Sequence, residues 1–137
     1  MQARYFIALA ALSMFLAVAA GAFGAHALKT ILSADLLAIW YTAVLYQLVH
    51  GLGLLAVGIL SLLRPQPALR WSGWAMLFGM LLFSGSLYLL ALSGMRALGA
   101  VTPVGGVAFL FAWGCLGWAG WHTDWRSGNS DVTKQQS

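Results

Sequence analysis

The sequence predicts an all-α integral membrane protein whose four helices form an up-down-up-down bundle. Apolar stretches fill most of its 137 residues, at roughly 5–25, 39–62, 72–93 and 102–122. Each stretch can cross a bilayer, because an α-helix rises about 1.5 Å per residue and the hydrocarbon core is about 30 Å thick. The composition agrees, since 61% of residues are hydrophobic and 7% are charged, against about 25% charged in an ordinary soluble domain. We therefore expect one transmembrane domain, 1–122, and a polar mobile tail, 123–137.

Other membrane architectures do not fit this pattern. In lipid the backbone must satisfy its own hydrogen bonds, which excludes an open sheet. The alternation of polar and apolar residues that is typical of barrel strands is absent from these continuous apolar runs. A helical bundle therefore remains as the predicted fold.

The first stretch is expected to stay in the protein as a helix. Arg4 precedes it and a small-x-small pattern at 25–27 follows it, which resembles a secretory signal. Its apolar run is longer than the core of about 7–15 residues that such signals have. Small residues at every fourth position, Ala17, Gly21 and Ala25, indicate a face on which another helix packs closely.

The connections between the helices carry their own signals. Apolar residues at spacings of three and four in 28–39 favour a short interfacial helix, either a connector on lipid headgroups or a lid over the bundle. Ser33 is placed to cap the second transmembrane helix. The segment 64–67, Arg-Pro-Gln-Pro, predicts a stiff turn, because proline blocks helix continuation. Thr102 and Pro103 predict the start of the fourth helix, with Thr102 as its cap.

Basic residues near the helix ends predict that both termini face the cytoplasm. The positive-inside rule counts this asymmetry. On the side of the termini lie Arg4, Arg64, Arg70, Arg126 and Lys134, and on the other side lie Lys29 and Arg96. Trp40 and Tyr41 are expected in the aromatic belt at the outer interface. Because the basic residues are scattered over helix ends, we expect no nucleic-acid partner.

Polar side chains at membrane depth are costly, which makes them the candidates for a functional site. Those at overlapping depths in the outer half are Tyr46, Gln47 and His50 of the second stretch and Ser84, Ser86 and Tyr88 of the third. Tyr46 and His50 are four residues apart and Gln47 lies beside them, so we expect one polar stripe on the second helix. His26 and Thr102 are placed at the outer mouth of the bundle.

Two interpretations of this polar stripe remain open. In the first, the polar side chains satisfy one another and tie the helices together, at about 1 kcal/mol per hydrogen bond. In the second, they orient the head of a lipid, quinone or other amphiphile. In that case Met80, Phe83 and Leu87 form an apolar wall.

Metal binding and catalysis are not expected from these residues. His26, His50 and His122 fall at three different depths, whereas ligands of one metal or haem must share a layer. The sequence has no Glu, and Asp35, Asp124 and Asp131 lie outside the bilayer core. Nothing orders the serines against His50 in a catalytic motif. We therefore expect no bound cofactor, no metal site and no enzymatic activity.

Four ordered motifs give the sequence a family resemblance. They are the segment from Gly21 to Leu28, the segment from Tyr41 to His50, Phe83 to Tyr88, and Thr102 to Gly106. In order and spacing the motifs resemble the YgdD/YwdK-like family of small bacterial inner-membrane proteins, over essentially all of 1–122. The resemblance implies four spans in the inner membrane of a bacterium and a domain of unknown function, with no catalytic residues to carry over.

The sequence as a whole indicates a binding or accessory component of the membrane. Its outer-half polar site would serve helix association or an amphiphilic ligand, with membrane lipids, a larger membrane complex or a second copy of the chain as partners. The alternative is a transporter or channel-like subunit. A single four-helix bundle is too small to enclose much of an aqueous path, so transport would require an oligomer.

Overall fold

Long helices make up almost all of the described chain. The computed structural model describes residues 2–123. Its elements are α1 (Gln2–His26), η1 (Leu28–Thr30), α2 (Ala34–Leu63), α3 (Pro67–Ser93), η2 (Arg96–Ala100) and α4 (Thr102–His122), where η1 and η2 are short 3-10 helices. All four α-helices are long and apolar enough to cross a membrane. The four predicted apolar helices are therefore confirmed, with α2 and α3 each beginning five residues earlier than expected.

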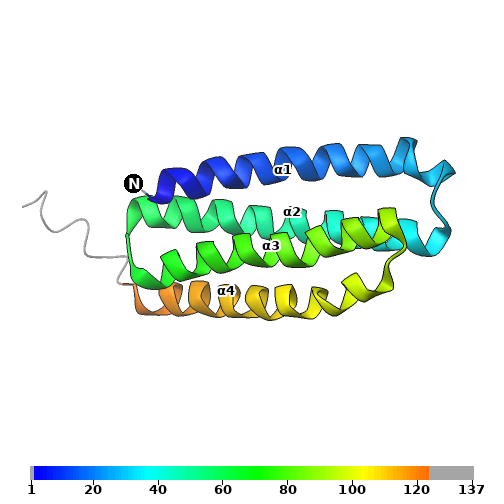
Figure 1. Cartoon of the computed structure of the whole chain (residues 1–137). Coiled ribbons are helices and arrows are strands. Elements are labelled where there is room, and N and C mark those ends of the chain that lie inside the picture. Colours follow the sequence, from blue (N-terminus) through cyan, green and yellow to red (C-terminus); the bar gives the residue numbers. More distant parts are fainter. Residues whose placement is uncertain (1, 124–137) are drawn as a thin grey trace, which may run out of the picture.

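The helices run alternately up and down (Figure 1). The start of α1, the α2–α3 turn and the end of α4 lie at one end of the bundle, which we call the terminal end. The α1–α2 and α3–α4 connections lie at the other, which we call the connection end. That the terminal end faces the cytoplasm stays a prediction. The predicted tail, 123–137, lies outside the described residues except for Thr123.

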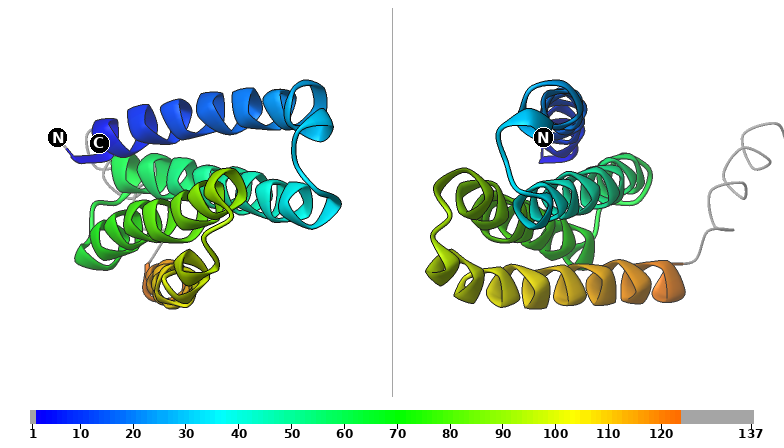
Figure 2. Two further views of the ribbon diagram at one scale, coloured as in Figure 1. Left: turned by 45° about the vertical axis from the view of Figure 1, so that its right-hand side comes forward. Right: turned by 90° about the vertical axis from the view of Figure 1, so that its right-hand side faces the viewer.

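The central pair of the bundle is α2 and α3. Each helix packs extensively on its neighbour in sequence, and α1 and α4 lie on opposite sides of the central pair (Figure 2). In one view of Figure 2, α1 is seen end-on while α4 runs across the picture, so the two outer helices cross. About 17% of the most apolar part of α1 and of α4 is buried, against 44% for α2 and α3. The outer helices therefore present most of their surface to lipid.

Two clusters of buried side chains hold the helices together. The larger one lies toward the terminal end and includes Phe6 of α1, Leu54 of α2, Met76 of α3 and Phe109 of α4. The smaller one lies at the connection end and consists of Leu28, Trp40, Val44 and Ala91, with partly buried apolar residues packed around them. Leu28 fastens the α1–α2 connection onto the bundle, because it is buried while its neighbours in η1 are exposed.

The starts of α2 and α4 agree only in part with the predictions made from the sequence. Ser33 caps α2 as predicted, since its hydroxyl accepts a hydrogen bond from the backbone N–H of Leu36 at 3.4 Å. The prediction of a separate interfacial helix within 28–39 is wrong, because this segment is divided between η1 and the first turns of α2. Thr102 does not cap α4 either. It lies inside the first turn, next to Pro103, and Val101 is the residue that precedes the helix.

The backbone of α4 approaches that of α3 closely at Gly105. A Cβ atom on Gly105 would lie 2.5 Å from the backbone nitrogen of Phe83 and 2.8 Å from its Cβ. Both atoms belong to or adjoin a helix backbone, which cannot rotate out of the way. Small residues allow such approaches in membranes, where packing takes the place of the hydrophobic drive. Of the predicted small-residue face on α1, Ala17 is fully buried, Gly21 is half-buried and Ala25 is exposed.

We expect Gly105→Ala to force α4 away from α3 and to lower the free energy of unfolding by roughly 1–3 kcal/mol, as overpacked core positions do. Gly114→Ala is the matched control on the same helix, because a Cβ there would meet no atom within 4 Å. Thermal unfolding of both variants in detergent micelles, followed by circular dichroism, measures the difference. Equal stabilities would contradict the close approach.

Candidate functional site

The predicted polar stripe on α2 is divided between two sides of the bundle. Gln47 contacts α1 and α3, whereas Tyr46 and His50 pack against α4 and Phe83. The prediction of one stripe is therefore wrong. The physical reason is the central position of α2: with α1 on one side and α4 on the other, residues next to each other in sequence face different helices.

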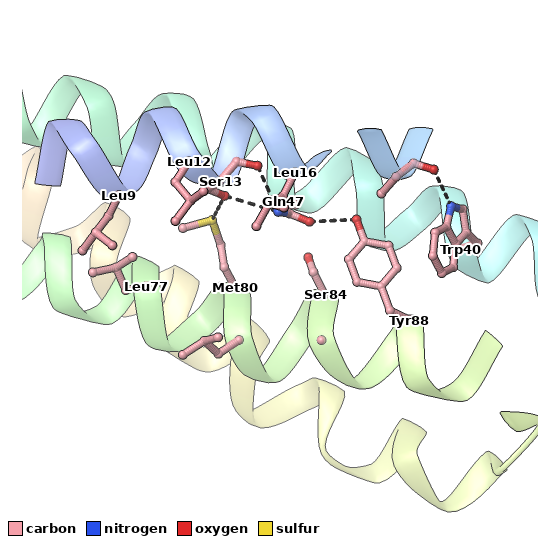
Figure 3. A pocket seen from close by; sticks show the side chains of 13 residues that line it. Leu9, Leu12, Ser13, Leu16, Trp40, Gln47, Leu77, Met80, Ser84 and Tyr88 are labelled. Carbon is pink, nitrogen blue, oxygen red and sulfur yellow. Dashed lines mark hydrogen bonds between the residues drawn. The ribbon is translucent and has the colours of Figure 1, made fainter. Parts of the chain in front are cut away.

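Gln47 links three helices through both ends of its side-chain amide. Its Nε2 donates to the backbone oxygen of Ser13 in α1 at 3.0 Å. Its Oε1 accepts from the hydroxyl of Tyr88 in α3 at 2.8 Å. The Ser13 hydroxyl in turn donates to the Met80 sulfur at 3.3 Å. Figure 3 shows this chain of hydrogen bonds crossing from α1 to α3 over α2.

Two further hydrogen bonds close the same region toward the connection end. The indole Nε1 of Trp40 donates to the backbone oxygen of Ala20 at 2.9 Å. The Ser84 hydroxyl donates to the backbone oxygen of Ala43, also at 2.9 Å. The ring of Trp40 packs on that of Tyr88, with centroids 4.6 Å apart. Trp40 is buried, so its predicted place in a lipid-facing aromatic belt is wrong. It joins α1 to α2 instead.

A groove of about 490 Å³ lies between α1 and α3 along this chain of bonds. We call it the α1–α3 groove. Its walls are leucines of α1 and residues of α3, and α2 forms its floor (Figure 3); the lining is Leu9, Leu12, Ser13, Leu16, Ala20, Trp40, Gln47, Leu77, Met80, Leu81, Ser84, Gly85 and Tyr88. The groove opens to the lipid side, since Leu12 is 53% and Leu81 is 73% exposed on its rims.

The polar atoms of the α1–α3 groove are already paired within the protein. The polar groups of Gln47, Ser84 and Tyr88 are all engaged in the hydrogen bonds given above. Across residues 2–123, every buried side-chain nitrogen or oxygen has a hydrogen-bond partner. A ligand in the groove therefore meets mainly leucine, methionine and aromatic surface. This arrangement suits a hydrocarbon chain better than a polar head.

His50 and Tyr46 belong to an aromatic column on the other side of α2. The His50 Nδ1 lies 2.7 Å from the backbone oxygen of Tyr46, which makes this nitrogen the N–H donor. Its ring stacks on that of Phe109 with centroids 3.4 Å apart, and the Tyr46 ring stacks on Phe83 at 4.2 Å. The column packs α4 on the central pair. Phe83, expected in the wall of a pocket, is part of this column.

The remaining predicted residues lie away from the groove. Ser86 shares a hydrogen bond of 2.9 Å with Thr102, which ties α3 to the start of α4. Leu87 is buried but does not line the groove. His26 is exposed at the last residue of α1. Neither predicted outer-mouth residue, His26 or Thr102, therefore contributes to the groove.

Sequence reasoning missed the α1 side of the site. Ser13 supplies two acceptors and a donor, yet it stands alone in an apolar run and gives no periodic signal. Gly85, which lies between two serines, was not predicted to line a site. A Cβ on Gly85 would meet no atom within 4 Å, so the groove continues over its backbone. Residues 2–123 contain no group of three His, Cys, Asp or Glu side chains that could hold a metal ion.

We expect Gln47 and Tyr88 to be energetically coupled. A double-mutant cycle of Gln47→Leu and Tyr88→Phe should give a coupling energy of about 0.5–1 kcal/mol, the size found for hydrogen bonds between membrane helices. Unfolding in mixed detergent micelles measures it. A matched cycle of Gln47→Leu with Ser86→Ala should give a coupling near zero, because Ser86 bonds to Thr102 instead. Equal values in the two cycles would contradict the three-helix link.

Comparison with known proteins shows extended similarity. Residues 20–106 match the family model described as protein of unknown function, DUF423. A UPF0382 membrane protein of Staphylococcus saprophyticus is 51% identical over 110 residues, which cover 80% of this chain and 91% of that relative. The UPF0382 membrane protein YwdK of Bacillus subtilis is 44% identical over 111 residues, which cover 80% and 90%. No solved structure matches the chain significantly.

These similarities confirm the resemblance to YwdK and the multi-pass location in a bacterial membrane. The matched residues 20–106 include the α2 and α3 parts of the α1–α3 groove and exclude most of its α1 wall. With more than half of its residues matched, the chain belongs to the DUF423 family of UPF0382 membrane proteins, whose function is unknown.

Proposed function

We propose that the protein is a lipid-binding component of the membrane and that the α1–α3 groove takes one hydrocarbon chain of an amphiphile. The single observation that carries the proposal is a groove of about 490 Å³, lined by leucines, Met80 and aromatic rings, whose polar atoms are internally paired. The ligand class named here is the acyl or isoprenoid chain of a membrane amphiphile. The groove leaves no free donor to orient a polar head.

The length of the groove supports a chain from a single leaflet. It runs along α1 from Leu9 to Ala20 and along α3 from Leu77 to Tyr88, which is about 16 Å on each helix at helical rise. Half of a hydrocarbon core is about 15 Å. The stretch of α1 is centred on its helix, whereas the stretch of α3 lies nearer the connection end. The positive-inside rule predicts that the connection end lies in the outer leaflet.

In this proposal the polar network is structural. The Ser13–Gln47–Tyr88 bonds hold α1 and α3 apart at a set distance over α2, and the space between the two outer walls is the groove. The network thereby combines the two interpretations drawn from the sequence: helix association by the polar groups, and amphiphile binding beside them. The proposal assigns no catalytic role to these side chains.

The test is a leucine placed in the groove. Gly85→Leu projects into open space, so it should fill the groove without disturbing the helices. Gly114→Leu is the matched control, since a Cβ there also meets nothing within 4 Å and it lies on α4, away from the groove. The probe is a phospholipid with a photoreactive diazirine on one acyl chain, reconstituted with each protein in vesicles.

We expect cross-linking to residues of the groove to fall several-fold in Gly85→Leu and to stay at the wild-type level in Gly114→Leu. Peptide mapping should place the wild-type label on leucines of α1 and on α3. A label spread evenly over the exposed faces of α1 and α4, with no response to Gly85→Leu, would show ordinary boundary lipid and reject the proposal.

A further inference from the structure

A second cavity, of about 480 Å³, lies at the terminal end of the bundle and differs in character from the α1–α3 groove. Its walls are the first turn of α1, the last turn of α2 and the start of α3. Phe6 is buried at its base, where the ring meets that of Trp74 edge-on at 5.7 Å. Half of its eight lining residues are polar, and one of them, Arg70, is charged.

Three of the four polar side chains that line this cavity are not paired within the described chain, and the fourth, Gln66, is paired. Gln2, Ser61 and Arg70 line it, and none of the three side chains makes a hydrogen bond or an ion pair with residues 2–123. In the α1–α3 groove, by contrast, the polar groups are paired. The amide, hydroxyl and guanidinium groups of these three residues are all donors, and the guanidinium can only donate. The cavity is therefore suited to an acceptor-rich anion.

The frame around these donors is stiff. Pro65 and Pro67 restrict the backbone of the α2–α3 turn. Gln66 between them is anchored at the end of α4, because its Nε2 donates to the hydroxyl of Thr123, the residue that follows this helix, at 2.6 Å. Arg70 follows one turn later on α3, at the rim of the cavity. A guanidinium presents a planar fork of donors that matches phosphate oxygens in pairs.

We propose that this cavity is a binding site for a phosphate group, with Arg70 as its charged ligand and Ser61 and Gln2 as further donors. The phosphate is carried either by an anionic phospholipid at the membrane surface or by a soluble molecule. Both sources offer the same chemistry, and a basic pocket at the cytoplasmic ends of transmembrane helices is a place where anionic headgroups bind.

The test compares Arg70→Gln with Arg4→Gln. Both variants remove one exposed positive charge from the terminal end of the bundle, but Arg4 does not line the cavity. The purified full chain in an uncharged detergent is titrated with phosphatidylglycerol, with phosphatidylcholine and with inorganic phosphate. Native mass spectrometry counts the bound lipid, and thermal unfolding reports on inorganic phosphate.

We expect Arg70→Gln to bind phosphatidylglycerol about fivefold more weakly than wild type, the effect of one arginine near an anionic lipid surface. Arg4→Gln should bind as wild type does, and Arg70→Lys should fall between them, because it keeps the charge and loses the fork. A preference for phosphatidylglycerol that depends on Arg70 assigns the phosphate to a lipid. Stabilisation by inorganic phosphate that depends on Arg70, without that preference, assigns it to a soluble molecule. Equal losses in Arg70→Gln and Arg4→Gln, or no loss in either, would overturn the proposal.

Discussion

The amide of Gln47 is the interaction on which the arrangement of α1, α2 and α3 depends. An amide at membrane depth has no water to satisfy it, so each of its polar atoms must find a partner on a neighbouring helix. Ser13 and Tyr88 are those partners. Because they come from different helices, one side chain sets the distance of both walls from the floor of the α1–α3 groove. Removing it would leave α1 held only by its packing on the neighbouring helices.

The packing on the other side of α2 follows a different principle. There the rings of Tyr46, His50, Phe83 and Phe109 stack closely, and Gly105 lets the backbone of α4 approach that of α3. Stacked rings and a glycine contact leave little room between helices. The bundle is therefore tight between α3 and α4 and grooved between α1 and α3, although both pairs are built from similarly apolar sequences.

The sequence predicts the elements of this fold better than their mutual arrangement. Helical spans and the Ser33 cap follow from local rules of length, hydropathy and hydrogen bonding, which act within a few residues. Trp40 was misplaced because an indole suits both a membrane interface and a buried bond to a carbonyl, and the choice depends on where α1 lies. Gln47 and His50 were predicted to form one stripe because helical periodicity gives the angle between their side chains around the axis of α2. It does not give the number of helices that surround α2, and here the two side chains face different ones. The α1 wall of the groove carries almost no polar signal in the sequence.

The crossing of the two outer helices also affects the surrounding bilayer. The 25 residues of α1 span about 37 Å, and the 21 residues of α4 span about 31 Å. Since the helices cross (Figure 2), both cannot stand along the membrane normal. Lipids beside α1 thus meet an apolar wall of different height and slope from those beside α4. Hydrophobic mismatch of this kind thins or thickens a bilayer locally at modest cost. The protein is accordingly asymmetric in the membrane plane, with two flanks that favour different local thickness.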